Sequence, residues 1–168
     1  MHGLPAASTE QTMDEIIAFK SLCPDFVVVT SPYYFGATQK EIIAHFKEIS
    51  ARSPFPVIAY DISPCTHNKI GVEAMVEISS MDNVVGLKDG SGDFIAFSRV
   101  LFQTGKQNLV WIMCHDYLNG DALAIGAKGI VTGLGNVWIE PYLEMFKAAQ
   151  ERDFATVRKI QEKINRLY

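Results

Sequence analysis

The sequence lacks the features that mark several large classes of protein. Its 168 residues carry 15 lysine and arginine residues against 19 aspartate and glutamate residues, a net charge of -4, and no run of like charges. Neither nucleic acid nor an anionic membrane surface is therefore an expected partner. The longest apolar stretches, "FVVV" and "FPVIAY", are far shorter than the roughly 20 residues that cross a bilayer, and residues 1–10 do not resemble a signal peptide. The sequence predicts a cytoplasmic protein that acts on a small molecule.

Cysteines are few, and complete glycine motifs are missing. The three cysteines, Cys23, Cys65 and Cys114, are odd in number and far apart, which favours reduced thiols over a disulfide framework. A dinucleotide site would require Gly-x-Gly-x-x-Gly between a strand and a helix, and both "GLGNVW" and "DGSGDF" lack the third glycine. We expect no cofactor.

Short apolar segments alternate with longer amphipathic ones along the chain. We expect strands at residues 25–30, 56–60, 84–88, 109–113 and 129–133. We expect helices at residues 8–22, 38–53, 71–80, 93–103 and 119–126, and two more from residue 140 onward. Ser8 or Thr9 is the expected cap at the start of the first of these helices. Strands that are apolar at nearly every position are typical of a parallel sheet covered on both faces, so the fold class is α/β.

The alternation is compatible with two architectures, an open doubly wound sheet and a (β/α)8 barrel. A barrel normally needs about 250 residues, and this chain supplies about five of the eight units. At 168 residues, the chain is expected to form a single domain. Within the helix at 38–53, Thr38 and Glu41 form an expected capping box, Ile42, Phe46 and Ile49 are expected on the buried face, and His45 is expected to be solvated.

The carboxyl ends of the expected strands carry most of the reactive side chains. In both architectures these ends gather on one rim, where active sites form. The residues concerned are Thr30 to Tyr34, Tyr60 and Asp61, Lys88 and Asp89, Cys114 to Asp116, and Thr132 and Gly133. The rim therefore combines a lysine, tyrosines, hydroxyls and acids.

Lys88 is the most informative of these residues. It ends the apolar run Val84–Leu87, where burial would disfavour an ammonium and lower the lysine pKa. A neutral lysine amine attacks carbonyls to give Schiff bases, a reaction that also requires a proton shuttle, and Tyr60 ends the preceding strand. The alternatives are a lysine that extends into water and a tyrosine that only packs at the rim.

Two other kinds of function stay open. Cys65 and His67 follow one strand and Cys114 and His115 follow another, and zinc accepts such ligands. Neither Cys-x-His nor Cys-His is a standard structural spacing, so we expect no metal. The third alternative is a non-catalytic fragment or binding module.

Three segments resemble a known family: "VVVTSPYYFGATQKEIIAHFKEI", "PVIAYDI" and "VVGLKDGSGD". They are similar to the class I aldolases that include dihydrodipicolinate synthase and N-acetylneuraminate lyase. The most specific features are the Pro-Tyr-Tyr turn, the strand-final tyrosine and the Gly-x-Lys-[Asp/Glu]-x-[Ser/Thr]-Gly segment. The resemblance implies a (β/α)8 barrel that forms a lysine Schiff base with pyruvate or a 2-keto-3-deoxy acid and cleaves or makes a carbon–carbon bond.

The resemblance also implies roles for individual residues. Lys88 corresponds to the Schiff-base lysine and Tyr60 to the tyrosine that transfers the proton. Tyr34 corresponds to a tyrosine that crosses a dimer interface to complete the proton relay of the neighbouring subunit, which implies a homodimer or homotetramer. Val131 would line the pyruvate site through its backbone.

Three further residues are expected to contact the substrate. The glycine at Gly90 keeps side chains out of the space above Lys88, and Asp116 lies at a strand end on the same rim. Cys65 stands where dihydrodipicolinate synthases carry the arginine of Tyr-Asn-x-Pro-x-Arg-Thr-Gly, which holds the substrate carboxylate. A thiol cannot make that bidentate contact, so a 2-keto-3-deoxy acid is expected ahead of the lysine-biosynthetic substrate.

Relative to the family, the chain is expected to be truncated at both ends. The first three strands of the family have no recognised counterpart, and the C-terminal helical tail is cut short at Tyr168. The expected fold is therefore a partial barrel of about strands 4 to 8. The missing part includes the loop whose hydroxyls bind the pyruvate carboxylate, so the chain alone is expected to trap pyruvate weakly or not at all.

Overall fold

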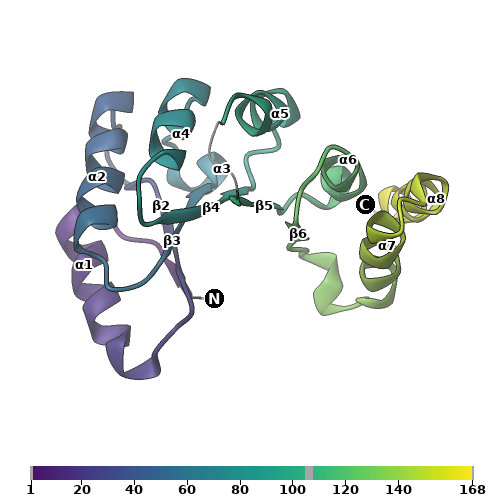
Figure 1. Cartoon of the computed structure of the whole chain (residues 1–168), viewed down its shortest axis with the longest axis horizontal. Helices are drawn as coiled ribbons and strands as arrows, with labels where there is room; N and C mark the ends of the chain where they lie inside the picture. The colour runs from purple at the N-terminus through teal and green to yellow at the C-terminus, as the bar shows by residue number, and fades with distance from the viewer. Residues whose placement is uncertain (1, 105–107, 168) are drawn as a thin grey trace. The chain divides into compact units, whose positions relative to one another are not determined.

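The computed structural model describes residues 2–104 and 108–167. The chain divides into two compact units, Met1–Leu109 and Val110–Tyr168. Strands alternate with helices in both units (Figure 1). The α/β class predicted from the sequence is confirmed.

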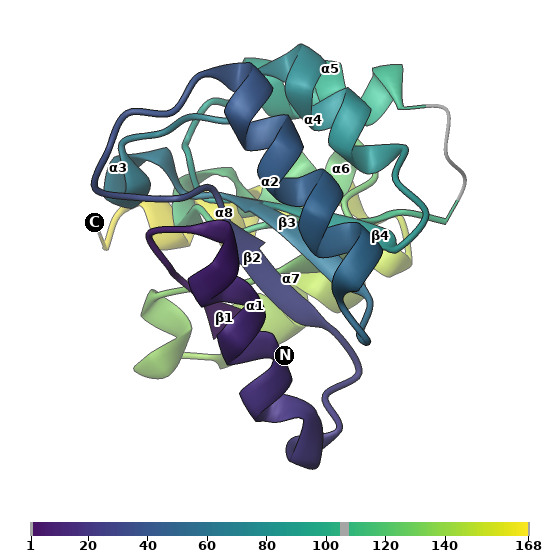
Figure 2. The same cartoon turned by 90° about the vertical axis from the view of Figure 1, so that its left-hand side faces the viewer.

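The first unit contains four strands, β1 (His2–Leu4), β2 (Val27–Thr30), β3 (Val57–Asp61) and β4 (Val84–Asp89). Its helices are α1 (Thr9–Ala18), the 3-10 helix η1 (Phe19–Leu22), α2 (Gln39–Arg52), α3 (Ser63–Thr66), α4 (Val72–Ser79) and α5 (Phe94–Gln103). The strands pair in parallel in chain order, β1 with β2, β2 with β3 and β3 with β4. Helices α1, α2, α4 and α5 lie side by side along these strands (Figure 2).

The sequence-based count of five strands was wrong, because the described residues contain six. The missed strand, β1, pairs with β2 from His2 with Val27 to Leu4 with Val29. Only Leu4 of its three residues is a buried apolar side chain, so the segment is too short to show a period. It is formed by its backbone pairing with β2.

Two helix starts were predicted correctly from their capping residues. The Ser8 hydroxyl accepts a hydrogen bond from the Gln11 amide before α1. Thr38 and Glu41 form a complete capping box before α2, which satisfies two amide groups that the helix leaves without partners. The apolar face of α2 is buried through Ile42, Phe46 and Ile49, so this face packs into the core.

The expectation for His45 was wrong. Its side chain is 3% exposed, and the ring contacts the Thr9 hydroxyl at 2.9 Å through Nδ1 and the Thr30 carbonyl at 3.2 Å through Nε2. Burial lowers the pKa of His45 to about 4, and the contact with the Thr30 carbonyl opposes that shift. His45 lies three residues after Ile42 and one before Phe46, so the helical period places it on the buried face.

The second unit contains two strands, β5 (Val110–Met113) and β6 (Gly129–Ile130), which pair in parallel. Its helices are η2 (Asp116–Leu118), α6 (Asn119–Ala124), η3 (Leu134–Asn136), α7 (Glu140–Gln150) and α8 (Phe154–Asn165). Strand β6 is shorter than expected and ends before Val131. The core of this unit comprises Leu123, Tyr142, Met145, Ala148, Val157, Ile160 and Ile164. Across residues 2–104 and 108–167, no helix is long and apolar enough to span a membrane.

Candidate active site

Strands β3 and β4 bring Tyr60 and Lys88 together. The two residues are direct partners in the parallel register, so their side chains lie on the same face of the sheet. The Lys88 Nζ atom lies 3.8 Å from the centre of the Tyr60 ring, and both side chains are half-buried. That Lys88 is neutral stays a prediction.

Thr30 extends this row of side chains by one strand. It pairs with Tyr60 in the register between β2 and β3, so its side chain shares the face that carries Lys88. Thr30 is 7% exposed, and its hydroxyl has no hydrogen-bond partner among the described residues. The sequence showed Thr30 only as one of several strand ends, and the register was the information that was missing.

Two aspartates occupy the opposite face directly after this pair. Asp61 follows Tyr60, Asp89 follows Lys88, and the two are register partners. Asp61 is 1% exposed and Asp89 is 8% exposed. Burial raises the pKa of Asp61, against the opposing charge of Lys69. Burial and the negative charge of Asp61 together raise the pKa of Asp89 to about 6, although the Ser91 amide opposes that shift.

Sequence analysis missed Lys69, which lies between α3 and α4. Its Nζ atom is 3.3 Å from Asp61 Oδ2, 3.4 Å from Asp93 Oδ2 and 3.3 Å from Ser91 Oγ. It gave no signal because it follows a short helix rather than a strand.

Tyr34 lies on the turn after β2 in a strained backbone conformation. Its φ angle is 83°, in the left-handed region that residues other than glycine rarely adopt. The side chain is 81% exposed, and its ring meets the neighbouring Phe35 ring edge-on at 4.8 Å. Tyr33 and Phe35 are also exposed, at 41% and 76%. The turn therefore presents three aromatic rings on the surface of this chain.

Gly90 and Cys65 follow the two central strands of the site. The Gly90 amide donates to the Asp61 carbonyl at 2.8 Å, which ties the segment after β4 to the end of β3. Cys65 is exposed on the short helix α3. Their contact with substrate stays a prediction.

Asp116 and Val131 belong to the second unit. Asp116 is 7% exposed, and its Oδ2 atom accepts hydrogen bonds from the amides of Gly133 at 3.1 Å and Leu134 at 3.4 Å. The Val131 amide donates to the Met113 carbonyl at 2.8 Å. Asp116 thus organises the segment that follows β6, and substrate contact at both residues stays a prediction.

The metal alternative rested on Cys65, His67, Cys114 and His115. Within the part of the chain that the structure describes, no group of three or more histidine, cysteine, aspartate or glutamate side chains is placed to hold a metal ion. His115 is half-buried, and its Nδ1 atom has no hydrogen-bond partner among the same residues.

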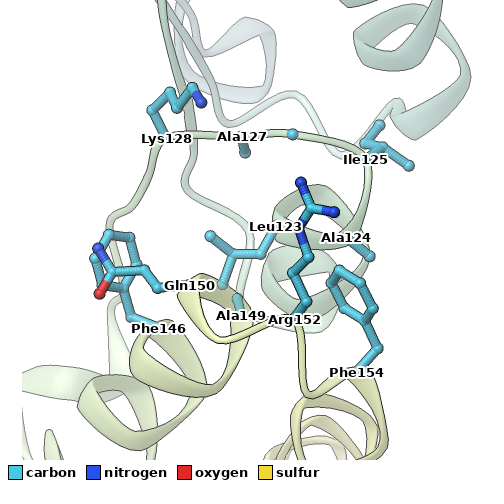
Figure 3. A pocket seen from close by; sticks show the side chains of 11 residues that line it. Leu123, Ala124, Ile125, Ala127, Lys128, Phe146, Ala149, Gln150, Arg152 and Phe154 are labelled. Atoms are coloured by element: carbon cyan, nitrogen blue, oxygen red, sulfur yellow. The ribbon is translucent and has the colours of Figure 1, made fainter.

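The second unit also contains a cavity of about 570 Å³ beneath the loop from α6 to β6 (Figure 3). The guanidinium of Arg152 points toward this loop, near Leu123 and Ala124 (Figure 3). Lys128, Phe146 and Phe154 also line the cavity. All of its lining residues lie in the second unit, so neither Lys88 nor Tyr60 contributes to it.

Comparison with known proteins identifies the family. The model of the dihydrodipicolinate synthetase family matches residues 4–168. The chain belongs to this family. The match covers both units, so the resemblance seen in three segments extends over nearly the whole chain.

The chain is similar to two curated 4-hydroxy-tetrahydrodipicolinate synthases. The enzyme of Methanospirillum hungatei is 30% identical over 166 residues, which are 99% of this chain and 57% of that protein. The enzyme of Corynebacterium aurimucosum is 29% identical over 161 residues, 96% of this chain and 52% of that protein. The chain therefore spans about half the length of these relatives.

Solved structures show the same fold. Dihydrodipicolinate synthase from Aquifex aeolicus matches with a TM-score of 0.90 at 27% identity, covering 98% of this chain and 56% of that one. The synthase from Thermotoga maritima matches with a TM-score of 0.92 at 24% identity, again covering 98% of this chain and 57% of that one. At that identity, the second match shows the fold alone.

Proposed function

We propose that the protein containing this chain is a class I aldolase or lyase, in which Lys88 forms a Schiff base with pyruvate or a 2-keto-3-deoxy acid. The observation that carries the proposal is the contact of Lys88 Nζ with the Tyr60 ring, at 3.8 Å, on paired strand ends. Membership of the dihydrodipicolinate synthetase family supports it.

In the proposed reaction, Lys88 is the nucleophile and Tyr60 transfers protons. The Lys88 ammonium first loses a proton, and the neutral amine adds to the ketone carbon of the substrate. Loss of water from the adduct gives a protonated imine at C2 of the substrate. When the C3–C4 bond is cleaved, the C4 hydroxyl loses its proton and leaves as an aldehyde, and the imine accepts the electron pair of that bond to become an enamine. In the reverse direction, the imine releases a proton to give the carbon nucleophile. Tyr60 is the group that moves protons in these steps.

We also propose that the chain is the C-terminal part of a (β/α)8 barrel and folds as one domain over residues 1–168. If β6 is the eighth strand, the six described strands are the third to the eighth. The chain spans 57% and 52% of the two curated relatives, which supports a part of a barrel rather than a whole one. The pyruvate carboxylate is then bound largely by residues of the first two βα units.

The favoured substrate is a 2-keto-3-deoxy acid, because Cys65 stands where dihydrodipicolinate synthases carry a carboxylate-binding arginine. The second candidate is synthesis of 4-hydroxy-tetrahydrodipicolinate, and the names of the curated relatives favour it.

Activity should be assayed in the longest natural polypeptide that contains the chain. Release of pyruvate from a 2-keto-3-deoxy sugar acid, lost in Lys88→Met, supports the first candidate. Formation of 4-hydroxy-tetrahydrodipicolinate supports the second. If the polypeptide shows neither activity, the proposal is refuted.

Self-association is part of the proposal. The exposed rings of Tyr33, Tyr34 and Phe35 form an apolar turn that another subunit would cover, as in a homodimer or homotetramer. Sedimentation of the longest natural polypeptide should show an oligomer that Tyr34→Asp weakens by about tenfold or more in dissociation constant. A monomer with full turnover would contradict this assignment.

A further inference from the structure

The ammonium of Lys69 contacts oxygens from both segments that follow the central strands. Asp61 ends β3, Ser91 follows β4, and Asp93 caps α5. Their oxygens lie 3.3, 3.3 and 3.4 Å from Lys69 Nζ, respectively. An ammonium has three N–H donors, so one lysine can serve all three oxygens.

The Ser91 hydroxyl connects Lys69 to Asp89. The Ser91 hydroxyl is 3.2 Å from each Asp89 carboxylate oxygen, and it also accepts a hydrogen bond from the Asp93 amide at 3.1 Å. On the other strand, the Asp61 carboxylate accepts from the Ser63 amide at 3.1 Å. These contacts form one network behind the rim, and two of its members, Asp61 and Asp89, directly follow Tyr60 and Lys88.

An ordinary surface ion pair would explain only part of this arrangement. The Lys69 side chain is 39% exposed and that of Asp93 is 44% exposed, so their contact is screened by water and stabilises little. The Asp61 side chain, in contrast, is 2% exposed, and a buried carboxylate needs a partner. The Lys69 ammonium, 3.3 Å from Asp61 Oδ2, supplies that partner.

We propose that Lys69 is a positioning residue that clamps the segments after β3 and β4 and thereby holds Tyr60 and Lys88 in reacting geometry. The inference rests on the proposed function for its catalytic consequence. Asp61 and Asp89 are bonded through the backbone to Tyr60 and Lys88, respectively, so movement of either of these aspartates moves a reacting side chain. A small displacement of a reacting group is enough to slow the reaction strongly.

The test compares Lys69→Met, Lys69→Arg and a control, Lys47→Met, on the exposed side of α2. Methionine keeps the length and apolar stem of lysine but removes the charge and all three donors, whereas arginine keeps charge and donors. Each variant is made in the longest natural polypeptide, and the rate of the pyruvate and borohydride adduct at Lys88 is measured at saturating pyruvate. Circular dichroism gives the folded fraction, and hydrogen exchange is followed at the amides of Ser63 and Ser91.

We expect Lys69→Met to slow adduct formation about tenfold or more at an unchanged folded fraction. Lys69→Arg should restore most of the rate, and Lys47→Met should match the wild type. Exchange at Ser63 and Ser91 should be about tenfold faster in Lys69→Met. An unchanged adduct rate in Lys69→Met, or a loss in proportion to the unfolded fraction, would overturn the positioning role.

The two proposals fail in different ways. If the wild type forms no adduct at Lys88, the proposed function is wrong, and the exchange measurement alone decides the clamp. Faster exchange at Ser63 and Ser91 in Lys69→Met then supports the clamp, and unchanged exchange overturns it.

Discussion

The buried pair Asp61 and Asp89 makes stability depend on pH in an unusual direction. The pKa of Asp89 rises from 3.8 to about 6 on folding, chiefly through burial and then through the charge of Asp61. An acid with a raised pKa stabilises the fold below its unfolded pKa, and this contribution is lost as pH rises through the folded pKa. The full rise corresponds to about 3 kcal/mol, of which about 2 kcal/mol is lost between pH 4 and pH 7.

The substitution Asp89→Asn isolates this contribution. Asparagine has nearly the same shape and its carbonyl oxygen accepts from the Ser91 amide, but it does not ionise. The free energy of unfolding is measured by urea denaturation at pH 4, 5, 6 and 7.5. As the pH rises across that range, the difference between the two proteins should change in favour of the variant by about 2 kcal/mol. Taking the difference between the two proteins cancels other titrating groups. A difference that does not vary with pH would refute the reasoning.

Two further predictions concern single side chains. Because burial lowers the pKa of His45 from 6.5 to about 4, the stability that its neutral form contributes is present above pH 6.5 and is lost as pH falls toward 4. His45→Gln should therefore reduce the loss of unfolding free energy between pH 6.5 and 4, as followed by urea denaturation, and an identical acid profile in the two proteins would contradict this. Tyr60→Phe should leave the Lys88 adduct possible but slow turnover by roughly 10² to 10⁴-fold, because a positioned acid–base group is lost. Steady-state kinetics measure this, and turnover at the wild-type rate would remove Tyr60 from the mechanism.

The elements that depend on local pattern could be predicted from the sequence. Apolar runs predicted β2 to β5, and the capping residues Ser8 and Thr38 predicted where α1 and α2 begin, because these signals depend on neighbouring residues alone. Strand β1 could not be predicted, since its three residues are held by pairing with β2. His45 was misjudged because its polarity was weighed above its position on the buried stripe of α2.

The same distinction applies to the candidate site. Lys88 and Tyr60 were recognisable because each ends an apolar strand, and the register then brought them together. Lys69 was not recognisable, because its partners lie 8, 22 and 24 residues away and only the folded chain brings them to its ammonium. Networks that join several loops have no local signature.

The proposed Schiff base at Lys88 is tested most directly by pyruvate and borohydride. In the longest natural polypeptide, we predict one irreversible reduced adduct, located by peptide mapping in "GLKDGSGD" and absent in Lys88→Arg, because a guanidinium stays protonated and forms no imine. The 168-residue chain alone should label weakly or not at all. Labelling at another lysine, or undiminished labelling in Lys88→Arg, would contradict the central claim.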